Sequence, residues 1–211
     1  MIALKINGEK HEIPAISELT FKQFNDTVVK SKVTKLQEYL SIFTSMSVEE
    51  LMSSKIKSVS ITSLYHHIFN VSVKEEINRK YESFTHNGNT FEMKEMSIDL
   101  FGEHYLFSLI FNQYKNKSLN VYELGLYALA ISLSNTQEMQ EIEEIYMDLQ
   151  NKNWRDVLPH GFFLLKKLCK KNKGLRRLLI ICILELSVIH WRIKYQAKKL
   201  KHMEKKLLAS Y

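Results

Sequence analysis

The chain has 211 residues, of which 45% are hydrophobic and 25% charged, a composition typical of a globular protein and not of a disordered one. Only 6 Gly and 2 Pro are present, which argues against the many tight turns of a β-sandwich or β-barrel. Residues 166–206 hold 14 Lys or Arg and two acids, a charge of +12, while the rest of the chain holds 16 bases and 21 acids, a charge of −5. The C-terminal segment therefore favours an anionic partner.

Residues 2–13 predict a β-hairpin. Apolar residues alternate with smaller or polar ones, and Asn7-Gly8 provides the positive φ angles that a two-residue turn requires. Pro14 ends the return strand, because proline has no N–H for pairing.

Helices are expected after this hairpin. Thr20 and Gln23 form a capping box for a helix whose apolar face holds Phe21, Phe24 and Val28. The next helix has its apolar residues at i, i+4 and i+7, namely Leu36, Leu40 and Phe43. Ser47 and Glu50 form a second capping box, and a helix over about 62–69 closes this portion of the chain.

Residues 80–94 predict a second hairpin around the turn region from His86 to Asn89. Aromatic and apolar residues flank this turn, which contains the second Asn-Gly of the chain. The shared turn chemistry suggests that the two hairpins pair into one small sheet.

The remainder is expected to be helical. Helices are predicted over about 101–115, over 121–134 after an Asn120 cap with Glu123 at its third position, and over 137–150. Pro159 and Gly161 interrupt the pattern, so that a soft boundary is expected at 150–160, before a short helix over about 160–171. Gly174 then precedes a long final helix, over about 175–209.

The fold class predicted from these elements is mainly α: a helical domain with two small β-hairpins and a long basic C-terminal helix. A body is expected over residues 1–155, with its hairpins at about 2–13 and 80–94. An apolar and then basic helical segment is expected over 156–211, and this segment could project from the body.

The final helix changes character along its length. From Leu178 to Trp191 it is apolar almost all round, which requires burial in protein or lipid. This stretch contains Glu185 and is shorter than the roughly 20 residues that span a bilayer, so a membrane anchor is disfavoured. Beyond Arg192 the helix is basic and retains only a narrow apolar seam, formed by Ile193, Ala197, Leu200, Met203 and Leu207. A solvated helix, a contact with another subunit and a contact with nucleic acid all remain open for this part.

The two cysteines, Cys169 and Cys182, have no partner at a metal-site or redox-site spacing. We expect buried free thiols and a reducing compartment. The N-terminus lacks the features of a signal peptide, so the chain is expected to be cytoplasmic when made. No catalytic site, cofactor or metal is predicted, since none of the eight histidines falls in a ligand pattern and no phosphate-binding or nucleophile motif is present.

The charge distribution and the spacing of the charged residues predict instead that the protein acts through surfaces that bind other proteins. The acidic cluster at 138–148 suits a solvated helix face, or a dock for the basic C-terminus in the same chain or in another copy. The predicted interaction residues are Glu141, Glu144 and Asp148 on one surface and Trp191, Lys194, Lys198, Lys201 and Lys205 on the other. Trp191 and Tyr195 lie among basic residues and could also stack on nucleic-acid bases.

Three segments resemble small proteins encoded among the structural genes of tailed bacteriophages. The first runs from Ile13 to Phe24 (IPAISELTFKQF), and the second from Leu40 to Leu51 (LSIFTSMSVEEL). Asp156 to Leu164 (DVLPHGFFL) is similar to a later element of the same proteins. Ser45 stands where those proteins usually have Gly. These motifs are structural and bring no active site with them.

The resemblance implies a non-enzymatic virion structural or assembly protein, present in the virion and, during assembly, in the host cytoplasm. It could be a ring component of the neck or tail that forms a homo-oligomer and contacts other virion proteins. Alternatives are a tail-assembly chaperone that is not retained in the particle, and a nucleic-acid-binding protein that uses the basic C-terminal helix.

Overall fold

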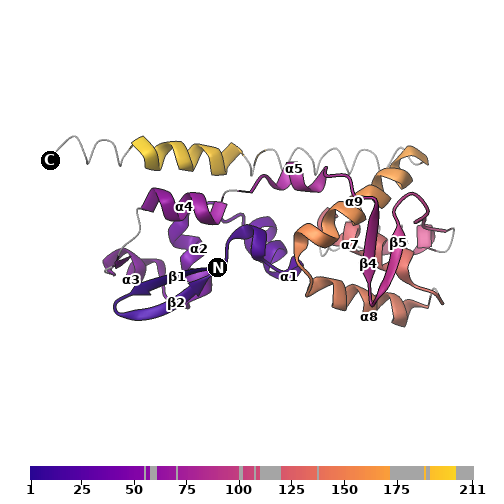
Figure 1. Cartoon of the computed structure of the whole chain (residues 1–211), viewed down its shortest axis with the longest axis horizontal. Coiled ribbons are helices and arrows are strands. Elements are labelled where there is room, and N and C mark those ends of the chain that lie inside the picture. Colours follow the sequence, from indigo (N-terminus) through magenta and orange to yellow (C-terminus); the bar gives the residue numbers. More distant parts are fainter. Residues whose placement is uncertain are drawn as a thin grey trace. The chain divides into compact units, whose positions relative to one another are not determined.

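The computed structural model describes residues 1–54, 56–57, 61–69, 71–99, 102–106, 108–109, 120–136, 138–171, 188 and 191–202. These residues form a mainly α structure with small antiparallel sheets, which confirms the predicted fold class (Figure 1). The chain divides into two compact units. Unit 1 contains Met1–Leu19, Gln23–Ser72 and Leu186–Tyr211, and unit 2 contains Thr20–Lys22 and Val73–Glu185. This division differs from the one expected after residue 155.

The predicted N-terminal hairpin is confirmed in unit 1. Strands β1 (Ile2–Ile6) and β2 (Glu9–Ile13) pair antiparallel, with Ile6 opposite Glu9. Asn7 and Gly8 have φ angles of 51° and 95°, which are the angles of a two-residue hairpin turn. Strand β3 (Ile56–Lys57) pairs with the other edge of β1, so that the sheet has the order β2-β1-β3.

The second hairpin is also confirmed, but the expectation that it shares a sheet with the first is wrong. Strands β4 (Ser83–His86) and β5 (Asn89–Glu92) form a separate two-stranded sheet in unit 2. β1 has β2 and β3 as its two neighbours, which leaves it no edge for a third strand. An Asn-Gly turn specifies a hairpin locally and does not specify what the hairpin pairs with.

The helices of unit 1 follow the predicted spacing. They are η1 (Ile16–Glu18), η2 (Asn25–Lys30), α2 (Leu36–Thr44), α3 (Val48–Ser53) and α4 (Ile61–Phe69). Helix α1 (Phe21–Phe24) begins where predicted, after Thr20, and continues directly into the π-helical η2. The capping box of α3 is present, since Glu50 N donates to Ser47 Oγ at 3.1 Å and Ser47 N donates to the Glu50 carboxylate at 2.7 Å.

Ser45 ends α2 in the left-handed region, with φ 58° and ψ 19°. Glycine adopts this conformation most readily, because a Cβ atom introduces strain there. Ser45, where the sequence resemblance leads us to expect Gly, therefore lies at a helix cap. The neighbouring Ser41 Oγ donates to Met46 O at 2.6 Å, which holds the turn that follows.

Residues 191–202 form a helix that packs in unit 1 alongside α4 (Figure 1). The Tyr65 hydroxyl lies 3.0 Å from Ile193 O and 3.1 Å from Thr34 O, and so connects this helix to α4 and to the chain before α2. Ile193 is buried, while Ala197 and Leu200 are partly buried. The described part of the apolar seam thus covers α4 of the same chain and does not project, because an apolar stripe on a helix is stabilised by any apolar face within reach.

Unit 2 is built on α7 (Val121–Leu133), whose residues are almost all buried. The predicted cap is confirmed, since Tyr122 N and Glu123 N both donate to the Asn120 side chain. Helices α8 (Met139–Gln150) and α9 (Trp154–Lys171) both pack against α7, and α5 (Val73–Ile77) packs against α9. Residues 102–106 and 108–109 are helical, in the range predicted. Cys169 and Cys182 lie among residues whose side chains the structure does not describe.

The predictions of a soft boundary at 150–160 and of a helix starting near 160 are wrong. Helix α9 begins at Trp154 and runs through Pro159 without a break. Proline inside a helix costs about 3 kcal/mol, since it removes a hydrogen bond and crowds the preceding turn. Packing compensates for this cost, because Trp154, Val157 and Phe162 of α9 are completely buried. Gly161 is a site of helix contact and not a chain break, for it lies directly against Gly125 of α7.

Candidate interaction surfaces

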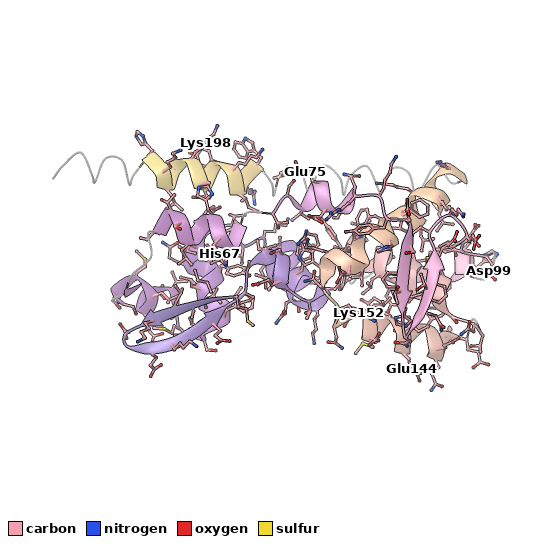
Figure 2. The ribbon with its side chains drawn as sticks, viewed as in Figure 1. His67, Glu75, Asp99, Glu144, Lys152 and Lys198 are labelled. Carbon is pink, nitrogen blue, oxygen red and sulfur yellow. The ribbon has the colours of Figure 1, made fainter. Side chains whose placement is uncertain are left out.

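Helix 191–202 presents a basic and aromatic outer face, which we call the basic face: Trp191, Arg192, Lys194, Tyr195, Lys198, Lys199 and Lys201, all of them exposed. A helix turns about 100° per residue, so Trp191, Tyr195 and Lys198 fall along its centre, opposite Ile193 and Ala197. Figure 2 shows Lys198 on the side of the helix away from α4. The sequence alone could have assigned this face from the seam, but not which partner covers the seam.

The two aromatic rings of the basic face are unusually exposed for their size. Trp191 is 65% exposed and Tyr195 is 54% exposed. Their ring centroids lie 5.6 Å apart with planes tilted by 19°, a stacked arrangement. Large exposed aromatic side chains with a fixed orientation are the type of residue that contributes most binding energy in protein interfaces.

The cations of the basic face have no acidic partner within the described chain. No ion pair forms there with Arg192, Lys194, Lys198, Lys199 or Lys201. Five like charges on three turns of one helix repel one another, so binding an anionic surface would relieve that repulsion. Lys205, the remaining predicted residue of this surface, lies outside the described residues.

Helix α8 presents the second surface, which we call the acidic face: Gln140, Glu144, Met147 and Asp148. Glu144 is exposed and accepts a hydrogen bond from Gln140 Nε2 at 3.1 Å, and Figure 2 shows it at the outer edge of α8. Asp148 is half exposed and lies 3.5 Å from Lys152 Nζ and 3.7 Å from His86 Nδ1. Met147, at 57% exposure, places a flexible apolar side chain beside the two carboxylates.

Glu141, the third acidic residue predicted from sequence, has a local role. Its carboxylate accepts hydrogen bonds from the Ser134 hydroxyl, from Thr136 N and Thr136 Oγ1, and from Asn135 N. These bonds hold the link between α7 and α8. They stabilise the charged form and lower the pKa of Glu141 to about 2, with the Ser134 hydroxyl as the largest contributor.

We expect Glu141→Gln to lower the free energy of unfolding by about 1 kcal/mol at pH 7, the usual cost of losing such a helix-start contact. The solvent around this carboxylate screens the effect well below the full value of the pKa shift. Because the folded-state pKa lies below the unfolded one, the charged Glu141 stabilises the fold above about pH 4.5 and loses this effect as the pH falls towards 2. Urea unfolding of wild type and variant from pH 7 to pH 2.5 measures this difference.

The control for this variant is Glu144→Gln, one turn along the same helix and exposed. It should leave stability within about 0.5 kcal/mol at every pH. If the difference between wild type and Glu141→Gln stayed constant from pH 7 to pH 2.5, charge on this carboxylate would not be its cause.

Sequence reasoning missed a polar cluster between α7 and α8. The Glu143 carboxylate accepts hydrogen bonds from Tyr105 at 2.8 Å and from Tyr127 at 3.0 Å and 3.2 Å. Tyr127 also stacks on Tyr146, with 3.9 Å between centroids. Burial and the nearby carboxylate raise the pKa of Tyr105 and of Tyr127. No sequence signal predicts that these residues are in contact, because they meet only when α7 and α8 pack. The cluster therefore stabilises the packing within unit 2.

Within the described residues, no group of three or more His, Cys, Asp or Glu side chains is placed to hold a metal ion. Among the same residues, no helix has both the length and the apolar character needed to cross a bilayer. Comparisons of the chain with protein-family models, with curated proteins and with solved structures found no match.

Proposed function

We propose that this chain is a non-enzymatic assembly protein of a tailed-bacteriophage particle, and that its copies associate through the basic face of one and the acidic face of the next. The observation that supports this proposal best is the basic face itself. Stacked, exposed Trp191 and Tyr195 lie among five cations that have no acidic partner in the described part of the chain. The phage context comes from the sequence resemblance.

The two faces are complementary in charge and in apolar chemistry. Glu144 and Asp148 can pair with lysines of another copy, which sets orientation more than affinity, since exposed pairs contribute about 0–1 kcal/mol each. Met147 can pack on Trp191 or Tyr195, and contacts between sulfur and aromatic rings contribute about 0.3–1.5 kcal/mol. The aromatic residues would therefore supply most of the affinity, and the charges would select the partner face.

A contact in which one copy uses its basic face and the next copy uses its acidic face is a head-to-tail contact. Such a contact generates a closed ring when the rotation between copies closes, and an open filament when it does not. A ring component of a neck or tail has this geometry. A tail-assembly chaperone that leaves the particle would use the same basic face, but towards a different virion protein.

Nucleic acid is the second candidate partner, and one observation favours it. Basic residues flank two aromatic rings on the basic face, an arrangement that serves both phosphate contact and base stacking in single-strand binding proteins. Binding of this kind would fall steeply with salt, in proportion to the number of phosphates neutralised.

Light scattering coupled to size exclusion tests the proposal on the full chain. At tens of micromolar protein and low salt we expect a discrete oligomer, and at about 1 M salt a return towards the monomer, because exposed charges are screened beyond about 3 Å. A strict monomer at both salts would refute self-association. Tight binding of a single-stranded oligonucleotide by that monomer, with a strong salt dependence, would favour the second candidate.

A further inference from the structure

Unit 2 contains a cavity of about 880 Å³ that neither interaction surface uses. It lies between the loop after α5, the β4–β5 hairpin and one side of α9. Its volume is in the range of pockets that hold small organic ligands, about 300–1,000 Å³. The residues that carry the argument are Lys80, Tyr81, Met93, Phe163 and Lys166.

Lys166 is the most informative residue of this cavity. Its side chain is half-buried, and this burial lowers the pKa of the lysine. Its Nζ donates to Asn78 Oδ1 at 2.8 Å, and no carboxylate pairs with it among the described residues. A partly desolvated ammonium group whose hydrogen-bond acceptor is neutral is stabilised when an anion binds beside it.

The other charges around the cavity reinforce this preference. Lys80 is exposed on its rim and, like Lys166, forms no ion pair within the described chain. Lys94 is paired with Glu92 at 2.8 Å, which neutralises one of the two acids in the lining. Arg79 is likewise paired, with Glu76 at 3.6 Å, so that Lys80 and Lys166 stand against Glu82 alone and the field inside favours an anion.

One part of the cavity wall is apolar and aromatic and is held in place. Met93 is buried, and Tyr81 lies 4.8 Å from the buried His160 ring, measured between centroids. Phe163 is 37% exposed, and Lys167 Nζ lies 5.1 Å from its ring centroid. Lys167 is itself fixed by hydrogen bonds to Lys94 O and Met96 O. A planar apolar group therefore finds a preorganised aromatic wall beside the cations.

We propose that this cavity binds a small organic anion in which an aromatic group carries a phosphate or carboxylate. The anionic group would contact Lys166 and Lys80, and the aromatic group would pack against Tyr81, Phe163 and Met93. The buried imidazole of His160 supplies part of the wall. Burial is the largest influence on its pKa and lowers it, while the Asp156 and Ser83 carbonyl oxygens that face its ring nitrogens act in the opposite direction.

Phenyl phosphate is the probe, titrated into the full chain and followed by ligand-detected NMR. We expect saturable binding with a Kd of about 1 mM or tighter. Inorganic phosphate and benzyl alcohol, each with one half of the chemistry, should bind at least about tenfold more weakly. Equal affinity for inorganic phosphate, or no saturation by phenyl phosphate, would overturn the proposal.

Two variants locate the binding in this cavity. Lys166→Met keeps the apolar stem of the lysine and should weaken phenyl phosphate by at least about tenfold. Asn78→Asp places a carboxylate beside the unchanged Lys166 and should weaken it similarly, in case the first variant folds poorly. Lys170→Met, an exposed residue of α9 outside the lining, is the matched control. Binding unaffected by the first two variants would overturn the proposal.

Discussion

Gly161→Ala is expected to lower the stability of unit 2 by about 3 kcal/mol or more, the upper range for forced overpacking. A Cβ atom at Gly161 would lie 2.2 Å from Gly125 O and 2.6 Å from Gly125 C. Both are backbone atoms of α7, so relief requires the two helices to separate. The intrinsic helix preference of Ala over Gly, about 0.5–1 kcal/mol, is too small to offset this cost.

Gly125→Ala is the matched control, because it places a methyl group at the same helix crossing from the other side. Its nearest neighbours are two ring carbons of Phe162, at 3.4 Å and 3.6 Å, which is ordinary contact. We expect a stability change within about 1 kcal/mol, with the preference of helices for Ala acting in its favour. The asymmetry between the two variants is the specific prediction.

Tryptophan fluorescence can follow unit 2 alone. The chain has 2 Trp: Trp154 is completely buried in α9, while Trp191 is exposed in unit 1. In a Trp191→Phe background, urea unfolding followed by fluorescence therefore reports on Trp154, which avoids treating two units as one transition. Equal destabilisation by Gly161→Ala and Gly125→Ala would show that the close backbone contact does not control the packing of α7 on α9.

The second large effect concerns assembly. Reversing charge on the basic face, with Lys194→Glu, Lys198→Glu and Lys201→Glu together, should raise the Kd of self-association at low salt by about 100-fold or more. Like charges placed opposite each other cost several kcal/mol, and a factor of 100 corresponds to about 2.8 kcal/mol. Glu144→Lys combined with Asp148→Asn should weaken association in the same direction from the acidic face.

Mixing the two variants provides the decisive measurement. The first variant keeps an intact acidic face and the second keeps an intact basic face, so an equimolar mixture should form a heterodimer through that one intact pair of faces, a mass that neither variant shows alone. Light scattering of each variant and of the mixture at low salt measures this. A mixture that stays monomeric while wild type assembles would contradict contact between these two faces.

The mixture also separates the two candidate partners. Nucleic-acid binding through the basic face would be lost in the lysine variant, retained in the α8 variant, and not restored to the lysine variant by mixing. Formation of the heterodimer on mixing, without added nucleic acid, is expected only when one copy binds another.

Local features of this protein are determined by the sequence alone. Both Asn-Gly turns, the Ser47–Glu50 capping box and the Asn120 cap occur as predicted, because each depends on residues within four positions of one another. The periodicity of apolar residues likewise locates α2, α4 and α7. The exposed cations of helix 191–202 follow from its narrow seam, since a residue opposite a buried stripe faces solvent.

Features that depend on contacts distant in sequence were decided only by the tertiary structure. Pro159 and Gly161 indicate a break when α9 is considered alone, yet the burial of its apolar face and the close approach to Gly125 keep it continuous. The pairing of β3 with β1, the hydrogen bonds of Glu143 with two tyrosines, and the anchoring of Ile193 by Tyr65 are contacts of the same kind. Local sequence fixes the conformation of a turn or cap, but many partners satisfy an apolar face or a carboxylate, and the choice among them is made when the elements pack together.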